Sequence, residues 1–77
     1  MNYFLFCRTM ETFEINEEYI ELMQLLKATN IAQSGGHAKM IVDEGEVRRN
    51  GEVETRRRAK LRSGDVVEVL GRTIRLQ

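Results

Sequence analysis

The sequence predicts an α+β fold in which two short packed helices lie on a small antiparallel sheet of hairpins. An apolar stripe within residues 16–29 predicts the first helix, and a capped segment at residues 34–44 predicts the second. Valine-rich runs at residues 46–54 and 66–76 each surround a glycine-containing turn, and they predict the sheet. Because the chain has only 77 residues, we expect one domain with a small core.

The first helix is expected at about residues 16–29. Asn16 is a typical N-cap, and the two glutamates that follow it suit the positive end of the helix dipole. Ile15 and Ile20 have the spacing of a hydrophobic staple across this cap. Alternating polar and apolar residues at 12–15 predict a short, half-buried strand before the helix. The apolar stripe consists of Leu22, Met23, Leu25 and Leu26.

The second helix is expected at about residues 34–44. Ser34 is placed to cap its start, and Gly45 is a typical stop signal. The loop between the two helices has about five residues, so the helices should pack as neighbours. The apolar positions recur at helical spacing, at Ala38, Ile41 and Val42.

The hairpin at residues 46–54 can form in two registers. A two-residue turn at Asn50-Gly51 would leave Val47 and Val53 on opposite faces of the hairpin. A three-residue loop at residues 49–51 pairs Val47 with Val53 on one face. We favour the second register because it buries both valines.

The hairpin at residues 66–76 is expected to turn at Gly71-Arg72, with the glycine at the first central position of a type II′ turn. Residues 63–65, Ser-Gly-Asp, form the turn that precedes it. The expected register places four apolar residues on one face and an exposed ion pair on the other. It pairs Val69 with Ile74, Glu68 with Arg75, and Val67 with Leu76.

Residues 1–9 are expected to be a tail or extension of the domain at residues 10–77, and Met10 is a candidate for an alternative start of translation. Cys7 is the only cysteine, so no internal disulfide can form, which suits a reducing compartment. The apolar run at residues 3–7 is far shorter than the ~20 residues of a membrane span and lacks the features of a secretory signal. We therefore expect a cytoplasmic protein without membrane association.

The residues that could support catalysis do not form a recognisable constellation. His37 and Cys7 are the only residues of their kinds, and zinc sites use about four ligands at characteristic spacing. Ser34 and His37 lie three residues apart, but a serine nucleophile also needs an orienting acid and an oxyanion pocket. The pair Gly35-Gly36 matches no phosphate-binding or dinucleotide motif. The sequence predicts a non-catalytic protein without a metal, cofactor or small-molecule substrate.

The charges divide the chain into an acidic half and a basic half, although the formal net charge is zero. Residues 1–46 carry eight acids and three bases, whereas residues 47–77 carry nine bases and four acids. Such asymmetry favours a polyanionic partner, and arginine suits forked contacts to phosphate. Seven of the bases lie within fifteen residues: Arg48, Arg49, Arg56, Arg57, Arg58, Lys60 and Arg62.

The start of the second helix could add to this basic cluster. Its first residues, Ser34-Gly35-Gly36, offer backbone amides to an anion, and Lys39 lies one turn further along. All five aromatic residues precede residue 20, so none lies among the arginines in the sequence. This arrangement argues against a platform for unpaired bases and favours recognition of the phosphates and shape of helical RNA.

Residues 22–69 resemble the αL RNA-binding family, the domain first described in ribosomal protein S-four. The matching features, in order, are Leu25-Leu26-Lys27, Ser34, Ala38-Lys39, Ile41, Gly45, Val47, Asn50-Gly51, residues 56–60 and Gly64-Asp65-Val66-Val67. The chain is most similar to the short stand-alone bacterial members of the YbcJ type. The resemblance implies two helices packed on a small twisted sheet, and binding of structured RNA, often ribosomal RNA or ribosomal particles.

The site predicted from the basic cluster and this resemblance comprises twelve residues: Ser34, Gly35, Gly36, Lys39, Arg48, Arg49, Asn50, Arg56, Arg57, Arg58, Lys60 and Arg62. Two positions depart from the family pattern. Gly35-Gly36-His37 stands where many members have an arginine, and Arg49 replaces a usually apolar strand residue. Two other partners remain open, an acidic protein surface bound by the same basic face, and duplex DNA.

Overall fold

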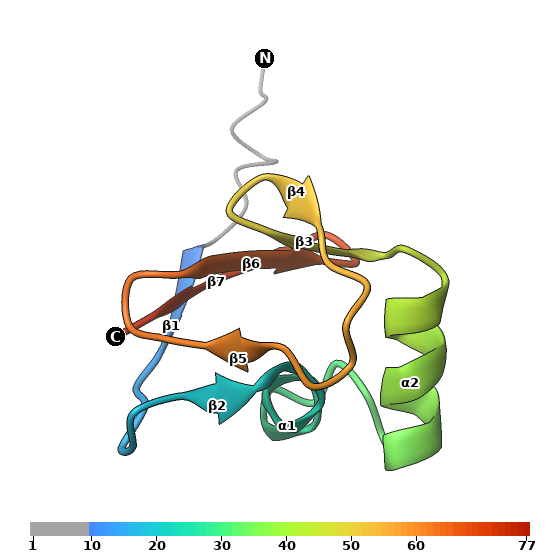
Figure 1. Cartoon of the computed structure of the whole chain (residues 1–77), viewed down its shortest axis with the longest axis horizontal. Helices are drawn as coiled ribbons and strands as arrows, with labels where there is room; N and C mark the ends of the chain where they lie inside the picture. The colour runs from blue at the N-terminus through green and yellow to red at the C-terminus, as the bar shows by residue number, and fades with distance from the viewer. Residues whose placement is uncertain (1–9) are drawn as a thin grey trace.

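The computed structural model describes residues 10–77 and has an α+β fold (Figure 1). A five-stranded sheet has the order β1-β7-β6-β3-β4, and β2 pairs with β5 in a separate two-stranded sheet. The predicted α+β class with two packed helices is confirmed. The elements are β1 (Met10–Phe13), β2 (Ile20–Glu21), α1 (Leu22–Ala28), α2 (Gly35–Asp43), β3 (Val47–Arg49), β4 (Glu52–Val53), β5 (Lys60–Leu61), β6 (Val66–Val69) and β7 (Arg72–Leu76).

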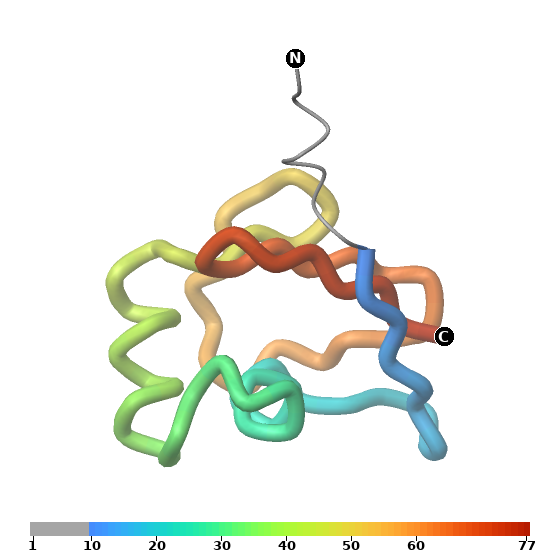
Figure 2. The backbone as a smooth tube through the Cα atoms, turned by 180° about the vertical axis from the view of Figure 1, so that it is seen from behind, coloured from blue at the N-terminus to red at the C-terminus, as the bar shows by residue number. Residues whose placement is uncertain are grey.

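The core lies between the five-stranded sheet and a layer formed by α1, β2 and β5, with α2 along one side (Figure 1). From behind, β1 lies beside β7 at the end of the sheet far from α2 (Figure 2). This β1–β7 pair is parallel, so the sheet is mixed rather than wholly antiparallel. The predictions for residues 1–9 lie outside the described residues. The largest fully buried side chains are Leu22, Leu25, Leu26, Val42, Val47, Leu61, Val67, Val69, Ile74 and Leu76.

The first helix begins at Leu22, so the predicted start at Asn16 is wrong. Ile20 and Glu21 instead form β2, whose antiparallel partner is β5. Glu21 becomes the N-cap, and its backbone N–H donates a 3.4 Å hydrogen bond to Oε1 of Gln24. A non-local strand pair has therefore overridden a good local capping signal, as tertiary context often does. The helix ends as predicted, because Thr29 is its C-cap.

The second helix matches the prediction closely. Ser34 is its N-cap, and the hydroxyl Oγ accepts a 3.1 Å hydrogen bond from the backbone N–H of His37. The backbone N–H of Gln33 donates in turn to Nδ1 of His37, at 3.1 Å. Gly45 follows the helix with φ of 74°, a left-handed conformation that glycine adopts without steric cost. The buried face carries Ala38, Ile41 and Val42.

The β3–β4 hairpin has the register that we did not favour. Arg49 pairs with Glu52 and Arg48 with Val53, across a two-residue turn at Asn50-Gly51. Both turn residues have positive φ, 50° and 89°, as a type I′ turn requires. Val53 is half exposed, so the premise that both valines must be buried was wrong.

The β6–β7 hairpin is shifted by two residues from the predicted register. The turn residues are Leu70 and Gly71, and Val69 pairs with Arg72 and Val67 with Ile74. Glu68 lies opposite Thr73, so the predicted Glu68–Arg75 pair does not form. Because side chains alternate with a period of two, a shift of two keeps the four predicted apolar residues on the core face.

Candidate nucleic-acid interface

The arginine-rich loop between β4 and β5 is fixed to the rest of the fold at both ends. At its start, the backbone N–H of Glu54 donates to the carbonyl of Val47, at 2.9 Å. At its end, the first amides of α1 donate to loop carbonyls: Leu22 to Ala59 at 2.9 Å, and Met23 to Arg57 at 3.3 Å. The loop therefore crosses from the sheet to the beginning of α1, in orange in Figure 1. Its backbone is held in place before any ligand binds.

Five basic side chains from this region line one surface cavity of about 420 Å³, which we call the basic groove. It comprises Arg49, Arg56, Arg58, Ala59, Lys60 and Arg62. A second cavity of about 360 Å³ adjoins it through Arg49 and Arg56, and it includes the predicted residue Asn50. The structure thus brings six of the twelve predicted residues together.

Asp65 positions Arg49 at one side of the groove. Its Oδ2 accepts from Nε and Nη2 of Arg49 at 3.2 and 2.8 Å, and from the backbone N–H of Arg62 at 2.9 Å. Its Oδ1 accepts from the side-chain amide of Asn50 at 3.2 Å. Burial tends to raise the pKa of Asp65, but these hydrogen bonds outweigh it and hold the pKa below the ordinary value of 3.8. The carboxylate is therefore ionised at neutral pH.

Glu54 is a buried carboxylate that lines the second cavity, with 9% of its side chain exposed. Its Oε2 accepts from the backbone N–H and from Nε of Arg56, at 3.1 and 3.0 Å. Nη1 of Arg49 lies 3.6 Å from its other oxygen. The side-chain hydrogen bond from Arg56 is the main cause of a lowered pKa of Glu54, and it exceeds the opposing effect of burial. The side chain of Arg56 remains 72% exposed, so it can still contact a ligand.

An aromatic ring lies beside two of the cations that line the groove. Nζ of Lys60 lies 5.0 Å from the ring centroid of Tyr19, and Cζ of Arg62 lies 5.8 Å from it. Both distances are within the range of cation–π attraction. Nearby, Nε of Arg58 lies 3.4 Å from a carboxylate oxygen of Glu21. The expectation that no aromatic residue lies among the basic residues is therefore wrong in three dimensions.

Ion pairs neutralise part of the positive charge of the groove. Three carboxylates, those of Glu21, Glu54 and Asp65, contact three of its five basic groups. Within residues 10–77, no carboxylate lies at salt-bridge distance from Lys60 or Arg62. The groove and its acids together keep an excess of two positive charges.

The other predicted residues lie elsewhere. Arg57 forms a forked pair with Asp43 at the end of α2, with nitrogen–oxygen distances of 3.0 and 2.8 Å. Lys39 lies one turn before Asp43 on the same helix face, and its charge contributes to the lowered pKa of Asp43, after the larger effect of Arg57. The amino end of α2, residues 34–36, is about 13 Å from Asp43 along the nine-residue helix. The basic loop thus reaches the carboxyl end of α2, not its amino end as we expected.

Arg48 is separated from the groove by the sheet. It alternates with Val47 and Arg49 along β3, and it pairs with Glu68 of β6. Because Val47 faces the core, Arg48 faces the outer side of the sheet.

The side chains that hold the groove in its arrangement were not predicted from the sequence. Three carboxylates each hold an arginine, those of Asp65, Glu54 and Glu21, and the Tyr19 ring contacts two cations. Some of these partners lie far apart in the sequence, by up to 43 positions. Only the Gly64-Asp65 pair carried a signal, as part of the family pattern. Among residues 10–77, no three metal-ligating side chains are grouped to hold an ion, and no helix has the length and apolar character to cross a membrane.

Comparison with known proteins identifies the family. The S4 domain matches residues 13–77, nearly all of the described chain. The chain belongs to the S4 domain family. The solution structure of YbcJ from Escherichia coli, described as revealing an αL motif involved in RNA binding, superposes with a TM-score of 0.68 and 36% identity, over 88% of this chain and 87% of YbcJ.

Sequence comparison gives the same relatives. YbcJ of Escherichia coli strain K12 is 37% identical over 68 residues, which cover 87% of this chain and 97% of YbcJ. RlbA of Bacillus subtilis strain 168, named as a probable ribosome maturation protein, is 49% identical over 57 residues, which cover 74% of this chain and 80% of RlbA. This S4 domain chain thus matches small proteins over most of their length.

Proposed function

We propose that this S4 domain protein binds structured RNA without catalysis, through phosphate contacts from the basic groove. The observation that carries the proposal is the convergence of five basic side chains on one cavity. The αL motif reported for YbcJ supports an RNA ligand, and the name of RlbA supports a ribosomal one. A ribosomal target also agrees with a cytoplasmic location.

The ion pairs within the groove are compatible with this role. The side chains of Arg56 and Arg58 are 72% and 80% exposed, so each can contact a further acceptor on its solvent side. An RNA phosphate, although tetrahedral, can accept two hydrogen bonds from one guanidinium through its two non-bridging oxygens, as a carboxylate does. The phosphate can therefore bind the same guanidiniums beside these carboxylates or in their place. In the absence of RNA, the carboxylates hold the guanidiniums over the groove, which reduces the entropy lost on binding.

Lys60 and Arg62 are expected to contribute most to affinity. Within the described part of the chain, their side-chain cations form no ion pair with a carboxylate, so a phosphate that binds them displaces none. Arg49 is expected to contribute least, because two carboxylates and the carbonyl of Lys60 already surround its guanidinium.

Fluorescence anisotropy with an RNA hairpin, measured between about 50 and 200 mM salt, tests the proposal. If all five groove cations contact phosphates, affinity should fall by roughly 10²–10³-fold over this range. Arg62→Ala should weaken binding and lower the slope of log affinity against log salt by about one. Arg48→Ala is the matched control, because it removes the same charge from the outer face of the sheet. It should change the slope much less.

Two results would overturn the proposal. One is equal loss of affinity from Arg48→Ala and Arg62→Ala, which would mean that net charge and not the groove determines binding. The other is the absence of hairpin binding by a folded protein at low salt. In that case, capture of an acidic protein from nuclease-treated cells would support the alternative adaptor function.

A further inference from the structure

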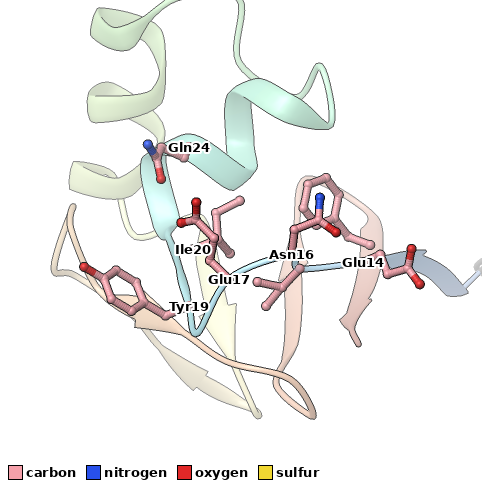
Figure 3. Close-up of a pocket in the computed structure, with 8 residues that line it drawn as sticks. Glu14, Asn16, Glu17, Tyr19, Ile20 and Gln24 are labelled. Atoms are coloured by element: carbon pink, nitrogen blue, oxygen red, sulfur yellow. The ribbon is translucent and has the colours of Figure 1, made fainter.

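A cleft of about 240 Å³ lies next to the basic groove, between the β1–β2 connection and the start of α1 (Figure 3). Tyr19 lies at one end of the cleft and Glu14 at the other. Of the residues that line the cleft, only Tyr19 lies beside cations of the basic groove. The lining residues are Phe13, Glu14, Ile15, Asn16, Glu17, Tyr19, Ile20 and Gln24.

The cleft combines apolar walls with hydrogen-bonding side chains. Phe13, Ile15 and Ile20 are only half-buried and pack against the core, so they leave apolar surface facing the cleft. Asn16 and Gln24 add amides that can both donate and accept hydrogen bonds. The volume is below the roughly 300 Å³ at which sites for drug-sized ligands begin. These properties suit a small flat group with a polar edge.

The charges of the cleft differ in sign from those of the groove. Glu14 and Glu17 line the cleft, whereas Lys60 and Arg62 lie on the groove side of the boundary at Tyr19. Carboxylates repel phosphate, but they accept hydrogen bonds from amino groups. A nucleotide that spans the boundary would therefore leave its phosphate over the cations and place its base in the cleft.

Tyr19 connects the two surfaces. Its ring lies near both cations and also lines the cleft. Unpaired RNA bases commonly stack on aromatic rings beside a positively charged backbone path. We propose that this cleft binds one unpaired, amino-bearing base of the RNA whose phosphates lie in the basic groove, with Tyr19 as the stacking partner. The inference rests on the proposed function.

Two RNA hairpins with the same stem provide the test, one fully paired and one with a single bulged adenosine. The protein should bind the bulged hairpin about tenfold more tightly, which corresponds to the lower part of the range for stacking of one base. Tyr19→Ala should remove this preference, measured as the ratio of the two affinities of the same protein, whatever the loss of the ring beside Lys60 and Arg62 does to both affinities. Tyr19→Phe keeps the ring and should keep the preference.

A spectroscopic measurement on the unmodified protein makes the test independent of whether Tyr19→Ala folds. With 2-aminopurine at the bulge, binding should quench its fluorescence as the base stacks. No quenching, equal binding of the two hairpins, or a preference retained in folded Tyr19→Ala would each overturn the base site and leave the groove proposal standing. Failure of both hairpins to bind would overturn both proposals. Arg62→Ala should weaken binding of both hairpins by the same factor.

Discussion

Replacement of Asp65 by asparagine should destabilise the fold strongly, because this carboxylate joins two turns and an arginine. It accepts four hydrogen bonds, two of them from the guanidinium of Arg49 and one each from Asn50 and the backbone of Arg62. Only 17% of its side chain is exposed. The amide of Asp65→Asn keeps one acceptor oxygen and presents donors to the donors of Arg49, so several of these bonds are lost.

The expected loss is about 2 kcal/mol of unfolding free energy, since hydrogen bonds to charged groups contribute roughly 1.5–3 kcal/mol and removing the charge also removes its desolvation cost. For a domain of this size, that loss lowers Tm by roughly 10 °C. Thermal unfolding followed by circular dichroism measures it. Asp43→Asn is the matched control, because its carboxylate also forms a fork with an arginine but is 46% exposed. It should leave Tm nearly unchanged.

The pH dependence gives an independent check of the same interaction. The pKa of Asp65 lies below 3.8 in the folded protein, so folding favours the ionised form. The stabilisation is therefore complete well above pH 3.8 and is lost as the pH falls through the folded-state pKa. The difference in Tm between the protein and Asp65→Asn should stay constant at neutral pH and become smaller below about pH 4. Equal losses from Asp65→Asn and Asp43→Asn, or a Tm difference that does not change in acid, would refute the reasoning.

Two further variants test local features of the fold. Leu70 is exposed and has φ of 48°, a left-handed conformation that is strained for leucine. Leu70→Asn should relieve this backbone strain and raise Tm by about 4–8 °C, and an unchanged or lower Tm would contradict this. Ser34→Ala removes the hydroxyl that accepts from the backbone N–H of His37, and it should lower the unfolding free energy by about 1 kcal/mol in a denaturant titration. Ser34→Asp should retain most of the stability. Equal losses from the two variants would show that the cap contributes little.

For the β6–β7 hairpin, the sequence was sufficient to predict which side chains face the core but not how the strands align. Val67, Val69, Ile74 and Leu76 are all buried as predicted, because alternation is a local property of a strand. The register depended on the turn, and Gly71-Arg72 was predicted because glycine suits the first central position of a type II′ turn. In the structure the turn is at Leu70-Gly71 instead, and Leu70 has a positive φ that leucine rarely adopts. The register is decided by the simultaneous pairing of β6 with β3 and with β7. A preference of the turn residues alone carries no information about this pairing.

The start of the first helix shows the same limit. Asn16 had a better capping side chain than Glu21, and the following glutamates suited a first turn. Pairing of β2 with β5 nevertheless keeps residues 20–21 extended. The later start of the helix matters for the candidate site, because the extended segment brings the Tyr19 ring close to Lys60 and Arg62. A helix from residue 16 would have placed the ring elsewhere.

The division of the chain into acidic and basic halves was interpreted as a signal for a polyanion, but much of it serves the fold. Three ion pairs join the two halves: Arg57 with Asp43, Arg58 with Glu21, and Arg72 with Glu11. Counting charges along a sequence cannot separate such cations from those available to a ligand, because the partners meet only in the folded chain. RNA affinity should therefore follow the position of each cation, with Lys60 and Arg62 contributing more than their share of the basic cluster.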